Sequence, residues 1–105
     1  MDLLAVFTTV ARREDADRIV DAVLAQGLAA CVQLSSIHSH YVWQGERCSE
    51  DEIRLLFKTP ADRYAALEAA ILALHPYELP AVYALPVQQA HAPYADWVIA
   101  HSAGG

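Results

Sequence analysis

The segment LHPYELP at residues 74–80 holds the side chains best suited to chemistry. A neutral His75 can ligate a metal or transfer a proton, and Glu78 follows closely enough to orient it. A cationic His75 would instead interact with the last carbonyls of a preceding helix. Tyr77 is equally open, as an apolar plug at an interface or as a hydrogen-bond donor to a ligand. The segment thus predicts either a functional site or simply a helix end.

A second polar group lies in the middle of the chain. His38 and His40 share one face of an expected strand, and Ser49 and Asp51 lie across from them in the expected pairing. Two imidazoles and a carboxylate are ligands for zinc or copper. A solvated strand end carries the same residue types, and we favour that interpretation here.

Lys58 is the remaining candidate, at the end of an expected strand and directly before a helix start. A lysine placed there can contact an anion or a carboxylate, although a solvated side chain is the more common outcome. The sequence has no glycine-rich phosphate loop, no Gly-x-Ser-x-Gly and no Cys-x-x-Cys. No catalysed reaction is therefore indicated. The enzymatic alternative is an acid–base pair made of His75 and Glu78.

Composition bounds the partners of the protein. The 105 residues suit one domain covering 1–105, and 55% of them are hydrophobic. Seven Lys and Arg against thirteen Asp and Glu give a net charge of −6, which argues against nucleic acid and anionic membranes. The N-terminal apolar run is too short for a signal peptide, and no stretch is long enough to span a bilayer. We therefore expect a cytoplasmic protein.

The hydrophobic periodicity predicts elements that would position these residues. They are a strand at 3–7, a helix at 12–26, strands at 28–43 and 46–59, a helix starting at Pro60 and capped by Thr59, a strand at 81–87 and a helix at 93–101. This order is that of an α+β ferredoxin-like fold, βαββαβ plus a C-terminal helix. Such a fold has an antiparallel sheet with two helices on one face.

The two central strands should form a long hairpin. Residues 44–45, Gln-Gly, make a two-residue turn that sets Val32 opposite Phe57 and Leu34 opposite Leu55. Beyond residues 35–36 the apolar positions switch to the other face, as Ile37, Tyr41 and Trp43. Either a bulge realigns them, or the hairpin is apolar on both faces and needs another subunit to cover it.

Taken together, these segments resemble the CutA family, the divalent-cation tolerance proteins. The matching stretches occur in family order across nearly the whole chain: VLAQGLAACVQL at 23–34, YVWQGE at 41–46, LLFKTP at 55–60, LHPYELPAVYALPV at 74–87 and APYADWV at 92–98. The resemblance implies a homotrimer similar in architecture to the PII signalling proteins. Its trimer interface would include Ile37, Tyr41 and Trp43, and its role would be tolerance of copper and other divalent metals.

The resemblance also implies where a ligand binds. Metal binding in some members uses a cysteine at the end of the first strand and a His-His pair before Pro-Tyr. Here those positions hold Thr8, Leu74 and His75, so only His75 remains as a ligand for Cu²⁺ or another divalent metal. The residues expected around a cleft between subunits, for a metal ion or a small ligand, are Trp43, Lys58, His75, Tyr77 and Glu78.

Overall fold

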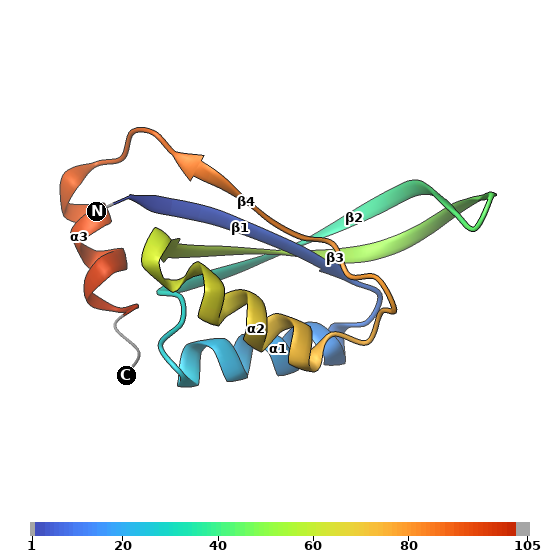
Figure 1. Ribbon diagram of the computed structural model, residues 1–105, viewed down its shortest axis with the longest axis horizontal. Helices are drawn as coiled ribbons and strands as arrows, with labels where there is room; N and C mark the ends of the chain where they lie inside the picture. The colour runs from blue at the N-terminus through green and yellow to red at the C-terminus, as the bar shows by residue number, and fades with distance from the viewer. Residues whose placement is uncertain (1, 103–105) are drawn as a thin grey trace.

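The computed structural model describes residues 2–102 and shows an antiparallel sheet covered by helices on one face (Figure 1). The strands are β1 (Leu3–Val10), β2 (Cys31–Trp43), β3 (Glu46–Pro60) and β4 (Val82–Val87). The helices are α1 (Arg13–Ala25), α2 (Tyr64–Leu74) and α3 (Ala92–Ala100), with a short 3₁₀ helix, η1 (Ala61–Arg63), before α2. The sheet order is β2-β3-β1-β4, with every pair antiparallel, which confirms the α+β ferredoxin-like fold with its C-terminal helix.

The core lies between the sheet and the helices α1 and α2, which run side by side beneath it in Figure 1. Val6 and Phe57 point down from the sheet, and Ile19, Leu67 and Ile71 come from the helices; all are 0% exposed. Leu67 and Ile71 are four residues apart, so they share one face of α2. This packing fixes the position of α2 beneath the sheet, and therefore the position of the segment that follows it.

The β2–β3 hairpin has the predicted register. Gln44 and Gly45 have φ of 51° and 79°, and the pairing runs without interruption from Cys31 opposite Lys58 to Trp43 opposite Glu46. No bulge interrupts the pairing at 35–36. The side chains of Ile37, Tyr41 and Trp43 therefore lie on the face away from α1 and α2, as the second alternative required.

The hairpin continues past the rest of the sheet. The last residue of β1, Val10, pairs with Ile53, and the part of the hairpin beyond that pair projects alone (Figure 1). Glu52 is therefore the first residue of β3 without a β1 neighbour in the ladder. Within the described residues, no strand pairs with this edge of β3 beyond Ile53.

The predicted cap of the second helix is wrong. The Thr59 hydroxyl donates a hydrogen bond to the Leu28 carbonyl oxygen at 2.7 Å, and both Thr59 and Pro60 still belong to β3. Pro60 is extended, with φ −69° and ψ 153°, so the chain passes through η1 before α2 begins at Tyr64. The hydroxyl links the end of β3 to the loop before β2 and makes no helix cap.

We expect Thr59→Val to lower the free energy of unfolding by about 1–3 kcal/mol, because the buried Leu28 carbonyl loses its partner. Thr59→Ser is the matched control: it keeps the hydroxyl and removes one methyl group, at a cost of about 0.8 kcal/mol. Denaturant unfolding of both variants and the wild type gives the comparison. A valine variant as stable as the serine variant would contradict this role of the hydroxyl.

Candidate functional site

The site begins where α2 ends. Proline disfavours helical geometry in the residue before it, and His75, which precedes Pro76, is extended with φ −74° and ψ 130°. The chain therefore leaves the helix axis, and the imidazole turns toward the end of β1. Its Nε2 atom lies 2.9 Å from the Thr9 carbonyl oxygen and 3.1 Å from the Thr8 hydroxyl. His75 thus contacts the sheet rather than the last carbonyls of α2.

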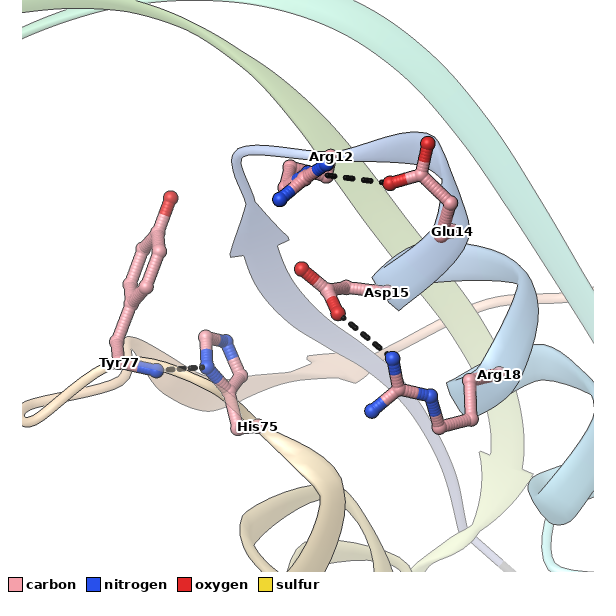
Figure 2. Close-up of polar contacts among 6 residues, drawn as sticks. All are labelled: Arg12, Glu14, Asp15, Arg18, His75 and Tyr77. Carbon is pink, nitrogen blue, oxygen red and sulfur yellow. Dashed lines mark hydrogen bonds and ion pairs between the residues drawn. The ribbon is translucent and has the colours of Figure 1, made fainter.

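The other ring nitrogen of His75 is also bonded. The backbone N–H of Tyr77 donates to Nδ1 at 3.2 Å, as Figure 2 shows. Pro76 has no N–H, so Tyr77 supplies the first backbone donor after the histidine. Since Nδ1 accepts a hydrogen bond, the proton of the neutral ring must lie on Nε2, which donates it to the Thr9 carbonyl. Neither nitrogen offers a free lone pair in this arrangement.

Burial lowers the pKa of His75 below its usual value, because the half-buried ring is poorly solvated when charged. The Thr9 carbonyl and the carboxylates of Asp15 and Glu52 oppose this shift. Asp15, at the start of α1, is itself paired with Arg18 at 3.1 Å (Figure 2). The net effect favours the neutral imidazole, the form required by the bond from Tyr77.

Tyr77 connects His75 to the β2–β3 hairpin. Its hydroxyl donates to Glu52 Oε2 at 2.6 Å, and its ring meets the His75 ring edge to face with centroids 4.9 Å apart. Burial, followed by the bond to Glu52, raises the pKa of the Tyr77 hydroxyl, so the group remains a donor. Tyr77 is therefore the loop residue that packs against the projecting hairpin.

Glu52 is the residue that the sequence analysis missed. It is only 8% exposed, although it lies in a stretch of acidic residues that looks solvated in the sequence. The one available signal was its register, because Glu52 pairs with Ile37 and so shares the face that carries the aromatic residues. Only the crossing of the loop over the hairpin buries it.

These contacts form one wall of a cleft with a volume of about 650 Å³. Of the expected site residues, Trp43, Tyr77 and Glu78 line it, and Tyr41 lines it beside Trp43. His75 lies behind Tyr77, and among the described contacts its ring bonds to Thr8, Thr9 and Tyr77 rather than to Glu78. The structure therefore brings together one wall of the cleft with His75 behind it, and the described contacts form no acid–base pair between His75 and Glu78.

Lys58 is far from this cleft within the protomer. It pairs with Ala5 in β1, and its Nζ atom lies 3.4 Å from the hydroxyl of Tyr94 in α3. At roughly 3.3 Å per residue, the stretch of β3 from Glu52 to Lys58 spans roughly 20 Å. Within the protomer, Lys58 does not line the cleft, and its ammonium group lies against Tyr94 instead.

The histidine pair on the hairpin has its own polar partners. Nδ1 of His38 lies 2.8 Å from Asp51 and Nε2 lies 2.6 Å from the Ser49 hydroxyl, while the His40 ring packs against it with centroids 4.8 Å apart. Both nitrogens of His38 are thus engaged across the hairpin. The arrangement matches the favoured interpretation of a solvent-facing polar strand end.

The donor atoms near His75 do not fit a resident metal centre. Thr8 contributes a hydroxyl and Leu74 contributes no donor, and both His75 nitrogens already have partners. Within residues 2–102, no group of three or more His, Cys, Asp or Glu side chains is arranged to hold a metal ion. A metal bound through His75 would first have to displace the bond from Tyr77 or the bond to Thr9.

Comparison with protein families gives one match over most of the chain. The family model described as CutA1 divalent ion tolerance protein matches residues 4–101. The divalent-cation tolerance protein CutA of Thermus thermophilus is 38% identical over 94 residues, which cover 89% of this chain and 91% of the relative. Protein CutA of Mus musculus is 39% identical over 95 residues, but the match covers 90% of this chain and only 54% of the longer mouse protein.

Solved structures agree with the sequence match. The divalent cation tolerance protein Cut A1 from Thermus thermophilus superposes with a TM-score of 0.91 at 36% identity, covering 95% of this chain and 98% of that one. CutA1 from Oryza sativa superposes with a TM-score of 0.93 at 29% identity, covering 100% and 97%. The similarity therefore extends over the whole fold, including the long hairpin and the segment that carries His75.

We expect His75 to make stability depend on pH in one direction. Its pKa is lower in the folded protein than the usual 6.5, so its contribution is complete above pH 6.5 and is lost as pH falls through the folded pKa. One proton accounts for a slope of at most about 1.4 kcal/mol per pH unit. Unfolding free energies between about pH 5 and 8 should show this slope in the wild type and not in His75→Gln. The exposed His91→Gln is the control and should behave as the wild type; equal slopes in all three proteins would refute the assignment.

Proposed function

The chain belongs to the CutA1 divalent ion tolerance protein family, and from this membership we propose that it acts as a homotrimer in the cellular response to copper and other divalent metals. A small ligand or a metal ion binds in clefts between its subunits. The observation that carries the proposal is the cleft of about 650 Å³ walled by Trp43, Tyr77 and Glu78. The cleft is built on the projecting hairpin, where a neighbouring subunit can complete it.

The trimer is supported by apolar surface that one protomer leaves open. On the sheet face away from α1 and α2, Tyr83 and Leu85 are 50% and 53% exposed. Tyr41, on the same face of the hairpin, is 39% exposed. Exposed apolar side chains on a sheet face without a helix layer are typical of a surface covered by another subunit. In a PII-like trimer, Ile37, Tyr41 and Trp43 lie at that interface.

The choice between a small ligand and a metal ion rests on donor atoms. The nitrogens of His75 are occupied, and Thr8 and Leu74 replace the softer ligands that copper prefers. The cleft, in contrast, offers aromatic and carboxylate side chains from three strands and the loop after α2. These features favour a small ligand in the cleft, with the link to metal tolerance acting through that ligand rather than through a resident metal.

A cytoplasmic location is part of the proposal. Cys31 and Cys48 are both free thiols, which is typical of proteins from a reducing compartment. Among residues 2–102, no helix is long and apolar enough to cross a bilayer.

Light scattering tests the trimer. We expect the wild type to show three times the protomer mass at micromolar concentration, and Leu85→Asp to shift to the monomer, because the change places a charge within the apolar contact. Leu72→Asp is the matched control, since Leu72 is 48% exposed on α2, and this variant should stay trimeric. A monomeric wild type would exclude the assembly, and a trimeric Leu85→Asp would exclude this face as its interface.

A Cu(II) titration in the presence of a competing chelator tests the role of the metal. We expect weak binding of the same strength in the wild type and His75→Ala, because the His75 nitrogens are occupied. The exposed His40, for which no ring hydrogen bond is described within residues 2–102, accounts for such residual binding, so His40→Ala should reduce it. Tight, stoichiometric binding lost only in His75→Ala would make the cleft a metal site and overturn the preference for a small ligand.

A further inference from the structure

Resting on the proposed ligand cleft, we propose that its ligand is a small organic cation, carrying an ammonium or quaternary ammonium group. The cleft combines two features that such cations require. Its walls are aromatic, and its ionisable lining is acidic. Protein sites for organic cations use aromatic ring faces for attraction and carboxylates for charge, and here both come from elements held in place by contacts described above.

Four aromatic side chains reach the cleft from three directions. Tyr41 and Trp43 come from β2, Tyr77 comes from the loop after α2, and Tyr83 comes from β4. Two of the rings are positioned by other aromatic side chains. Tyr83 stacks on Phe7 with centroids 5.2 Å apart, and Tyr77 packs against His75. A cation placed among such rings is attracted by their negative faces, at about 0.5–2 kcal/mol for each ring it contacts.

The charged side chains that line the cleft in the protomer are carboxylates. Glu50 and Glu52 line it from β3, and Glu78 lines it from the loop. Within the described lining there is no lysine or arginine, and the only basic side chain is that of His40. Anionic ligands would be repelled by this lining, whereas a cation would be attracted to it.

Glu52 is the buried carboxylate among the acidic residues that line the cleft. It is 8% exposed, and its described partner is the neutral hydroxyl of Tyr77 at Oε2. None of the ion pairs found within residues 2–102 involves Glu52. A buried carboxylate without an opposite charge is costly, and a cation entering the cleft would provide that charge.

A metal ion is a poorer match to the same lining than an organic cation. The cleft acids come from different elements, and no three ligating side chains within residues 2–102 are grouped closely enough for a metal. Metal ions also bind by replacing water with close, directed donors, whereas an alkylammonium group is attracted by ring faces at van der Waals contact. The large volume and the aromatic walls favour the second type of ligand.

Three probes of similar shape and different charge test the inference: benzylammonium, benzyl alcohol and benzoate. The readout is the Trp43 indole N–H chemical shift in NMR titrations of the intact protein. We expect benzylammonium to bind about tenfold more tightly than benzyl alcohol, and benzoate not to bind. Glu52→Gln should remove the advantage of the cation while keeping the shape of the side chain.

Glu68→Gln is the matched control, because Glu68 accepts a hydrogen bond from Tyr64 on α2 in the same way that Glu52 does from Tyr77. This variant should retain the preference for benzylammonium. Equal binding of benzylammonium and benzyl alcohol, lost in Trp43→Ala, would refute the cation inference and leave the ligand cleft intact. Absence of binding by all three probes to a protein that light scattering shows to be a trimer would refute both the inference and the cleft, while leaving the assembly standing.

Discussion

The hydrogen bonds of the His75 imidazole connect the end of β1 to the loop after α2 and, through Tyr77, to the β2–β3 hairpin. His75 donates from Nε2 to the end of β1, accepts at Nδ1 from the loop that leads to β4, and is itself the residue that ends α2. Through these bonds Tyr77 is aimed at the hairpin, where its hydroxyl meets Glu52. If the ring turned away, the loop would lose its bonds to the end of β1. The cleft wall would lose its support with it.

The same bonds explain why this segment supports one wall of the cleft and is a poor metal centre. The bonds that position Tyr77 use both nitrogens of His75, and burial favours the neutral ring that those bonds require. The remaining polarity of the cleft resides in carboxylates and aromatic rings. Within the CutA1 family, this chain therefore combines the common scaffold with a site whose chemistry suits a cationic ligand. Selectivity would come from charge and ring faces rather than from metal coordination.

The sequence was most informative where the physical rule was local. The Gln44-Gly45 turn requires positive φ at both residues, so it determined the whole β2–β3 register, and alternation then placed the apolar face of the hairpin correctly. The prediction of a helix cap at Thr59 was wrong because its hydroxyl could bond either to the helix start or to another segment. It bonds to the Leu28 carbonyl, which is distant in sequence. Sequence spacing contains no information about that carbonyl.

The sequence also could not predict burial that is created by segments distant along the chain. Glu52 sits among acidic residues and reads as solvent-facing, yet the loop carrying Tyr77 covers it. Lys58 was grouped with His75 through family resemblance, but in one protomer Lys58 pairs with Ala5 whereas His75 contacts Thr8 and Thr9, further along β1.

The hydrogen bonds of His75 are tested most directly by a long-range ¹H–¹⁵N NMR spectrum of the histidine side chains at neutral pH. We expect His75 to be a single neutral tautomer with the proton on Nε2 and none on Nδ1. An Nδ1–H tautomer, an imidazolium or an exchanging mixture would contradict it.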